Sequence, residues 1–470
     1  MNSPTFRWCV LLALLALVWR LPIAATAPMV AADEVTYSRP TVLRMLADEP
    51  LFYIAGTNYG APVHEALAVP LVRWFGESKL TLRLPVVVLG SVGVAMSFLV
   101  LRRVAGGGPA LGIALLMALG HSVIIRYTSF AHPLYAALSV LIPAGQLLAF
   151  RVDEERRMGR WIALGLCLGF AMYVLKVAIF AAAAVLAWLW WRSEHGQLWR
   201  AQWGEVAVRK RGGKCALLFA GAGAVALPVL YRFLTRRESF TASALELALA
   251  GTAAILAIAA AIVAIPFLRG ASHRAWLHAA VCLGLMLAVP MPAALWYRHM
   301  EKPRLEARGT REYDEAAYTW KHAHEWPTQA RIVLEGMLPA FLIGRETQLE
   351  HNPKATWPWT WEGALSVAFL AALGAGLSRK MREHGWRAAF GERDFVLIAP
   401  FFLTLAVMLP SWLLFSDYSF RYLLPFLPGL YLFAYRCLEL PIQRHRRAAV
   451  GLLAAYLVYC GIDAWHFSAW

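Results

Sequence analysis

The sequence predicts an all-α integral membrane protein with about thirteen transmembrane helices. Of its 470 residues, 60% are hydrophobic and only 16% are charged, and the mean hydropathy is +0.53. A water-soluble protein of this length needs a larger share of charged surface residues. The apolar runs are continuous and about 17–23 residues long, which matches a helix crossing the ~30 Å hydrocarbon layer.

The predicted spans follow one another along the whole chain, which we treat as one membrane domain, 1–470. The run that begins at Trp8 could be read as a signal peptide, but an uncleaved first helix is favoured because so many spans follow it. The fifth and sixth spans are short enough to form a tight hairpin, since only Lys176 separates them. The spans cover about 8–28, 81–101, 109–126, 133–150, 161–175, 177–191, 214–231, 243–267, 276–297, 361–377, 394–415, 421–437 and 447–463.

The formal charge of +16 is explained by topology rather than by nucleic-acid binding. Short clusters such as Arg102-Arg103, Arg156-Arg157 and Arg446-Arg447 lie between apolar runs, as the positive-inside rule expects of cytoplasmic loops touching anionic lipid. This pattern predicts an inner-membrane protein with a cytoplasmic N-terminus and membrane lipids as partners. The six cysteines are scattered and are expected to be small buried hydrophobic residues.

Two segments on the outer, periplasmic side are too long to be simple connectors, 29–80 and 298–360. Loops of this length usually form structured, functional elements. In the first, we expect short interfacial helices over Thr36–Leu46 and Ala66–Phe75. The second repeats an Asp-Glu pattern at Asp314, which a solvated amphipathic helix explains better.

The first candidate site is Asp33-Glu34-Val35-Thr36-Tyr37, directly after the first span. A carboxylate near the lipid boundary is partly desolvated and can accept a proton from an incoming hydroxyl. The alternative is that the acidic pair only stabilises a helix N-terminus.

The second candidate site runs from Tyr59 to Glu65 in the same segment. Gly60 and Pro62 shape a turn, after which His64 and Glu65 open an apolar helix. Glu65 could orient an acceptor sugar or bind a divalent metal ion together with Asp33. His64 or Glu65 could instead serve as a helix cap.

The third candidate site is Arg421, which enters the twelfth span. An arginine in a membrane helix needs an anionic partner, and a lipid-carrier phosphate would provide one through paired hydrogen bonds. Asp417, a lipid headgroup or simple snorkelling are alternatives. Lys176 and Arg126 fall at outer span ends and are secondary candidates for the same phosphate.

These elements, in this order, resemble the GT-C superfamily of polyprenyl-phosphate-sugar glycosyltransferases. The nearest branches are the protein O-mannosyltransferases and the lipid A aminoarabinose transferase. The matching pieces are "DEVTY" after the first span, "NYGAPVHEALAVPLVRWFGES", "LRLP" at 82–85 and "FRYLLPFLPGLYLF" from Phe420. Pro62-Val63-His64 departs from the apolar or Pro-Pro pattern of many relatives, which leaves the acceptor and the metal requirement open.

The resemblance implies an inverting glycosyltransferase that uses a sugar on polyprenyl phosphate as donor and a glycan, lipid or protein hydroxyl as acceptor. It maps the catalytic acidic residue to Asp33, its pair member to Glu34 and the donor-phosphate residue to Arg421. Glu65, His64, Tyr59 and Tyr37 are then expected near the acceptor or a metal ion. A transporter or flippase of a lipid-linked substrate is the main alternative, and a non-catalytic envelope scaffold is another.

Overall fold

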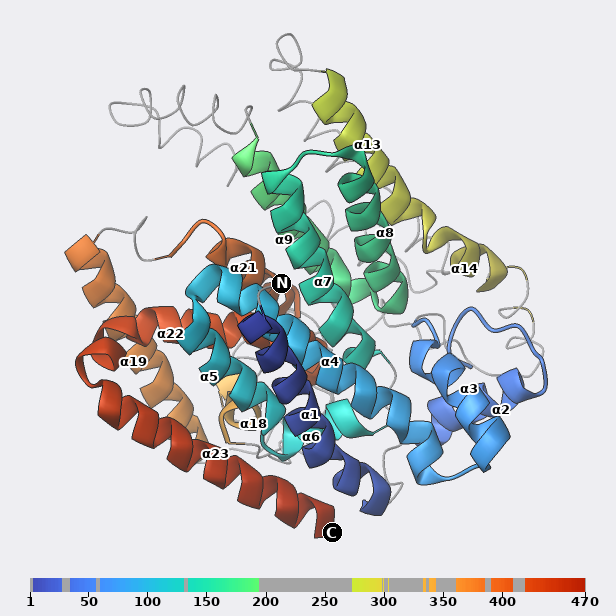
Figure 1. Cartoon of the computed structure of the whole chain (residues 1–470), viewed down its shortest axis with the longest axis horizontal. Helices are drawn as coiled ribbons and strands as arrows, with labels where there is room; N and C mark the ends of the chain where they lie inside the picture. Colours follow the sequence, from blue (N-terminus) through green and yellow to red (C-terminus); the bar gives the residue numbers. More distant parts are fainter. Residues whose placement is uncertain are drawn as a thin grey trace, which may run out of the picture.

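The computed structural model describes residues 3–27, 34–55, 60–130, 134–193, 273–297, 338–343, 361–384, 390–408 and 419–469, with 299, 303, 333 and 334 (Figure 1). Every regular element in these ranges is helical, which confirms the predicted all-α class. The elements are α1 (Ser3–Thr26), η1 (Glu34–Ser38), α2 (Arg39–Leu46), α3 (Val63–Phe75), α4 (Lys79–Ala105), α5 (Gly107–Ala118), α6 (Ser122–Ser129), α7 (Tyr135–Glu154), α8 (Met158–Val174), η2 (Lys176–Ala178), α9 (Ile179–Arg192), α13 (His273–Ala288), α14 (Met291–Trp296), α18 (Leu338–Ile343), α19 (Trp361–His384), α21 (Asp394–Met408), η9 (Ser419–Phe426), α22 (Leu427–Arg444) and α23 (Arg446–Ala469).

Long apolar helices make this an integral membrane protein. Within the described residues, seven helices are long and apolar enough to cross a membrane, or eight if the bent pair α5–α6 is one span. The predicted spans 214–231 and 243–267 lie outside the described residues, so the count of thirteen stays a prediction.

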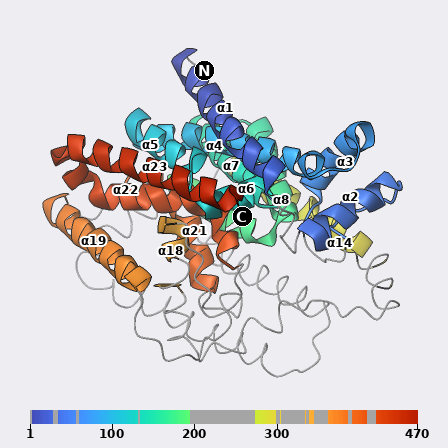
Figure 2. The same cartoon turned by 90° about the horizontal axis from the view of Figure 1, so that it is seen from below.

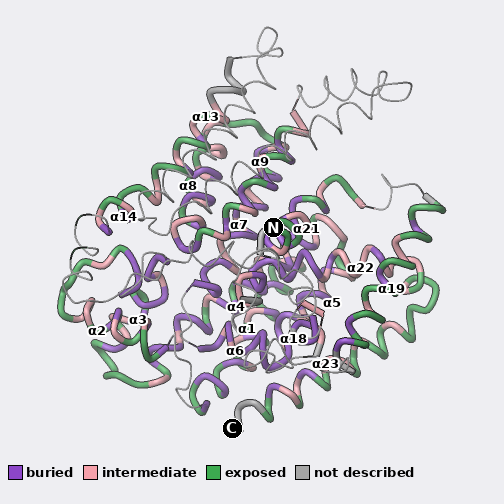
Figure 3. Tube along the Cα trace, turned by 180° about the vertical axis from the view of Figure 1, so that it is seen from behind, coloured by how far each residue is buried: buried purple, intermediate pink, exposed green. Residues whose placement is uncertain are grey.

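Helix α4 is the central element, and α1 packs antiparallel along it. The side chain of Arg102, near the end of α4, donates to Thr5 at the start of α1. At the other end, Arg83 of α4 reaches the carbonyls at the end of α1. Buried residues concentrate along α4 and α7, whereas α19 and α23 are largely exposed apolar helices suited to contact lipid tails (Figure 3).

The predicted span 109–126 is not one continuous helix. It breaks after Ala118, and α6 leaves α5 at an angle of 73°. A break inside a membrane leaves carbonyl groups at one helix end and N–H groups at the other without helical partners. The fully buried Arg20 of α1 donates to the carbonyls of Met117 and Ala118 at 2.8 Å. Asp463 of α23 accepts from the Ser122 N–H at 2.7 Å. Each charge therefore faces the helix end of opposite polarity, which stabilises the break.

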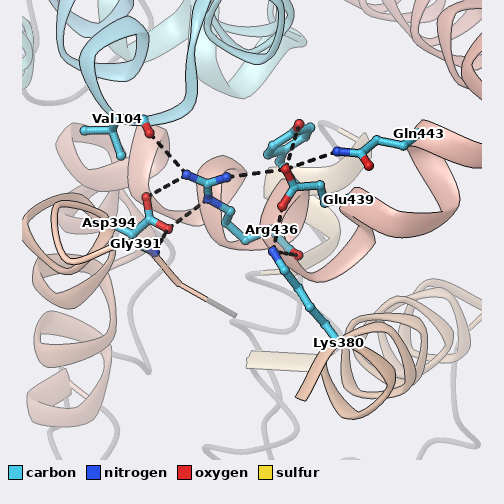
Figure 4. A network of polar contacts seen from close by, with 8 residues as sticks. Val104, Lys380, Gly391, Asp394, Arg436, Glu439 and Gln443 are labelled. Atoms are coloured by element: carbon cyan, nitrogen blue, oxygen red, sulfur yellow. Dashed lines mark hydrogen bonds and ion pairs between the residues drawn. The ribbon is translucent and has the colours of Figure 1, made fainter. Parts of the chain in front are cut away.

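The far end of α4 is joined to α19, α21 and α22 by a polar network (Figure 4). Arg436 of α22 binds both carboxylate oxygens of Asp394, at 2.8 and 3.1 Å, and the carbonyl of Val104 at 3.1 Å. Glu439 accepts from Lys380 of α19 at 2.6 Å. This network lies at the α19 side of the molecule, opposite the α2–α3 side (Figures 1 and 2).

Candidate active site

The segment between α1 and α4 folds into short helices that lie together at one side of the molecule. The segment has helical elements at η1, α2 and α3. Helix α3 ends at Gly76, whose φ of +80° favours glycine. Ser78 and Thr81 then form a reciprocal capping box that starts α4. Trp74 and Phe75 are 74% exposed at the end of α3, as expected of interfacial side chains.

The turn before α3 is held against α7. The Ile54 N–H donates to the carbonyl of Gly60 at 3.0 Å, which closes the turn. Gly60 has φ +87°, and a Cβ there would lie 2.8 Å from Leu134, directly before α7. Only glycine fits this conformation and contact, so the turn that carries the second candidate site is seated on the first turn of α7.

Glu65 and His64 form a buried polar cluster with Ser38 of η1. The Ser38 hydroxyl donates to Glu65 Oε1 at 2.9 Å and lies 3.0 Å from His64 Nε2. His64 Nδ1 is 3.1 Å from Glu65 Oε2. Glu65 is completely buried, and desolvation by burial raises its pKa to about 8. The cluster therefore joins η1 to α3 within the segment between α1 and α4.

Glu34 lies in a second buried cluster, with Arg83. Its two oxygens accept from Arg83 Nε at 2.6 Å and Nη2 at 2.7 Å, and both side chains are 0% exposed. Arg83 Nη1 also donates to the carbonyls of Ala24 and Ala27 at 2.8 and 2.9 Å. The guanidinium lies 4.4 Å from the ring centre of Phe130, directly after α6.

The third candidate residue, Arg421, lies in η9 beside two tyrosines. Its guanidinium is 5.9 Å from the ring centre of Tyr135 in α7 and 5.6 Å from that of Tyr422. Tyr135 contacts Tyr127 of α6, ring centre to ring centre, at 6.0 Å. The guanidinium of Arg126 is 5.8 Å from the Tyr127 ring. A continuous series of contacts thus connects the two arginines, both half-buried, through aromatic rings that favour a cation.

One apolar cluster joins these elements. It contains Ile54 and Ala61 of the first segment, Tyr127 and Tyr135, and Leu423 of η9. Tyr37 packs against its edge. The residues on both sides of Lys176 also belong to it, while Lys176 itself is exposed. The structure therefore brings the first segment, α6, η2 and η9 around a common core.

The predicted site residues divide into three groups. Arg421, Arg126, Lys176 and Tyr37 border the common core, whereas Glu34, Glu65 and His64 are buried in polar clusters. Asp33 and Tyr59 lie outside the described residues, as does the second predicted loop over most of its length.

Sequence reasoning missed two arginines, Arg83 and Arg20. Both lie in predicted spans, and both are completely buried. A lone arginine within an apolar run must find acceptors inside the protein, and this rule was the available signal. The described residues contain no group of three or more His, Cys, Asp or Glu side chains able to hold a metal ion.

Comparisons with known proteins agree with this architecture. Residues 60–209 match the model of the family described as dolichyl-phosphate-mannose-protein mannosyltransferase. The solved structure of ArnT from Cupriavidus metallidurans bound to undecaprenyl phosphate is similar over 98% of this chain and 70% of that one, with a TM-score of 0.50 and 16% identity. The Archaeoglobus fulgidus oligosaccharyltransferase AglB, in complex with an inhibitory peptide and a dolichol-phosphate, gives a TM-score of 0.48 and 15% identity over 99% of this chain and 55% of that one. A search of curated protein sequences finds no match.

The fold and the site define a membrane-embedded helical protein with the GT-C architecture. Residues 60–209 resemble this mannosyltransferase family and the fold resembles that of ArnT, in agreement with the resemblance seen in the sequence motifs.

Proposed function

We propose that this protein transfers a sugar from a polyprenyl-phosphate donor to a hydroxyl acceptor at the outer face of the inner membrane. The observation that carries the proposal is the convergence around the common core. The segment that follows α1 and the Arg421 segment are separated by most of the chain, yet both border one core with Arg126. The family match points to the same reaction class, because its description names a lipid-phosphate-linked sugar as donor.

The chemistry needs a base and a cationic site. Asp33 accepts the proton of the acceptor hydroxyl as the acceptor oxygen bonds to the anomeric carbon. The bond from that carbon to the phosphate oxygen breaks, polyprenyl phosphate leaves, and the configuration inverts. Arg421 and Arg126 stabilise the charge that grows on the departing phosphate. The exposed Lys176, at the edge of the same core, adds a third positive charge.

The acceptor and the need for a metal ion are the finer parts of the proposal. A glycan, a lipid or a protein can each supply the hydroxyl, and the buried Glu65–His64–Ser38 cluster shapes the segment on which it would rest. A divalent metal ion bound through Asp33 would lower the pKa of the attacking hydroxyl and stabilise phosphate charge.

Replacement of Asp33 by Asn tests the proposal. The variant should lose nearly all transfer from a polyprenyl-phosphate sugar in a membrane assay while reaching wild-type levels in the membrane. Asp48→Asn is the matched control, because Asp48 is an exposed acid of the same segment with φ +58°, a conformation that Asn tolerates. Full activity of Asp33→Asn would overturn the assignment of the base.

The donor is identified by comparing membranes from cells with and without the gene. Accumulation of one polyprenyl-phosphate sugar in the deletion strain would name the donor. An unchanged set of lipid-linked sugars would argue against the proposed donor class.

The broken helix α5–α6 is the one observation that favours a transporter or flippase. Transporters place substrates at interrupted helices, where helix ends and charges face the ligand. Here Arg20 and Asp463 already bind the two helix ends. The break is therefore explained by contacts within the fold. Lipid-linked sugar moved across vesicles without sugar transfer would favour the transporter.

A further inference from the structure

Arg83 binds Glu34, the second of the two acidic residues that follow α1. Ala27 directly follows α1, and Glu34 begins η1. Arg83 binds both, the Glu34 carboxylate through Nε and Nη2 and the Ala27 carbonyl through Nη1. One guanidinium therefore holds the end of α1 and the start of η1 together.

The geometry of Glu34 limits what it can do. Both of its oxygens lie within 2.7 Å of Arg83 nitrogens, and the side chain is completely buried. A carboxylate engaged in this way keeps no exposed oxygen to orient an acceptor. Its position is fixed by the arginine rather than by a substrate.

Arg83 also connects this point to the cationic side of the common core. Its guanidinium stacks on Phe130, and α6, directly before Phe130, carries Arg126 and Tyr127. Three elements, the end of α1, the start of η1 and the end of α6, thus meet at one side chain of α4. Any shift of Arg83 is transmitted to all three.

We propose that Glu34 and Arg83 form a buried positioning pair that sets the first segment against α6, and that Glu34 does not contact substrate. The inference rests on the proposed function, because it gives the two adjacent acids of that site different roles. Asp33 acts on the acceptor, and Glu34 acts through Arg83. Arg83 is a positioning residue of the same reaction.

A double-mutant cycle tests the pair. Glu34→Gln and Arg83→Lys should each lower kcat by up to about 100-fold, since a misplacement of about 1 Å has this effect, with the donor KM changed less than about threefold. In the Arg83→Lys background, Glu34→Gln should add less than about threefold, because the interaction is already lost. Losses that multiply, or a Glu34→Gln effect confined to KM, would overturn the proposal.

The pH–rate profile supplies a readout that general loss of structure does not move. If Glu34 takes no part in proton transfer, the acidic limb of the pH–rate profile should stay in place in Glu34→Gln, apart from its lower height. Glu34→Asp should recover part of kcat. Disappearance or displacement of the limb in Glu34→Gln would assign catalysis to Glu34 and overturn the proposal.

The matched control is Arg39–Glu77, a pair of the same chemistry in the same region of the chain. Both of its side chains are more than one-third exposed. Glu77→Gln should leave kcat and KM within about twofold of wild type, because exposed ion pairs contribute little. An equal loss of kcat in Glu77→Gln and Glu34→Gln would show that any change in this segment lowers activity. That result would overturn the positioning role of the Glu34–Arg83 pair.

Hydrogen exchange tests the pair without sugar transfer, so its result is independent of the proposed function. Amides in η1 and at the end of α1 should exchange at least tenfold faster in Glu34→Gln than in wild type, and those of α22 should not change. Equal exchange in η1 would overturn the proposal even if Asp33→Asn is inactive. Conversely, an active Asp33→Asn would refute the assigned base while leaving the exchange result intact.

Discussion

The two ends of α4, about 40 Å apart by helix geometry, are both held by an arginine bound to a carboxylate, but the surroundings differ. At the first end, Arg83 and Glu34 are 0% exposed. At the far end, Arg436 is 15% exposed and binds the buried Asp394; it also lies 3.5 Å from Glu439, which is 18% exposed and within reach of Lys380, Tyr435 and Gln443 (Figure 4). The first contact is a completely buried pair of charges, and the second is a network in which several side chains share the charges.

The difference predicts how each end responds to damage. Removing one partner of a buried pair leaves a charge in an apolar environment with no water to replace the lost bonds. Removing one member of a shared network leaves the others to compensate, and water reaches the site. The end near the candidate active site should therefore be sensitive to substitution, and the far end tolerant.

The largest expected effect is that of Arg83→Met. It should lower the free energy of unfolding by roughly 3–5 kcal/mol, because Glu34 is left buried without its guanidinium. The measurement is the apparent melting temperature of the purified protein in detergent. A decrease no larger than that of Lys380→Met would remove the contrast between the two ends.

Glu65 gives the next effect, through pH. Its carboxyl is buried beside the Ser38 hydroxyl and the His64 imidazole, and burial raises its pKa to about 8, above the ordinary value of 4.5. Between these two values the folded state holds a proton that the unfolded state has lost. Stability is therefore greatest below the unfolded pKa and is lost as pH rises through the folded pKa, by at most about 1.4 kcal/mol per pH unit.

The test compares the melting temperature of the wild type and Glu65→Gln from pH 5 to pH 9. The wild type should lose stability relative to the variant as pH rises to about 8, after which the difference should level off. A constant difference over the whole range would show that Glu65 is ionised in the folded protein throughout.

Asp463→Asn should have a smaller effect, about 0.3–2 kcal/mol. The amide oxygen of Asn can still accept from the Ser122 N–H, so only the attraction between the carboxylate charge and the N-terminus of α6 is lost. Thermal unfolding in detergent measures the change. An unchanged melting temperature would mean that the charge of Asp463 contributes nothing to stability at the start of α6.

Lys380→Met should have the smallest effect, about 1 kcal/mol, the usual net contribution of one hydrogen bond, because its partner Glu439 has other contacts although Lys380 is buried. Glu439 keeps its contacts with Arg436 and Tyr435, and the methionine chain retains the apolar packing of the lysine stem. The same melting experiment applies. A loss of several kcal/mol would show that the network at the far end is as irreplaceable as the buried pair.

The membrane class and the positions of the apolar helices follow from the sequence, since hydropathy over about twenty residues reports directly on burial in lipid. The break after Ala118 was not predictable from the same signal. Hydropathy is high across 109–126, and the residues that stabilise the break, Arg20 and Asp463, are distant in the chain.

The candidate site was predictable only in part. Asp33, Arg126 and Arg421 were singled out from residue type and position, and the last two lie in one connected group of rings and cations. The sequence favoured Asp33 as the catalytic acid through the resemblance but left the role of Glu34 open, because its contact with Arg83 joins residues 49 positions apart. The position of Asp33 and the roles of all these residues stay predictions.

The broken span also has a consequence for biosynthesis. The C-terminal end of α5 finds Arg20 in a helix that is already made, but the N-terminal end of α6 waits for Asp463, 341 residues later. At about 5–20 residues per second, the ribosome needs roughly 20 to 70 s to supply it. During that interval only contacts with earlier parts of the chain, such as those of Arg20 in α1, can stabilise the bend. The contact from Asp463 in α23 is added last.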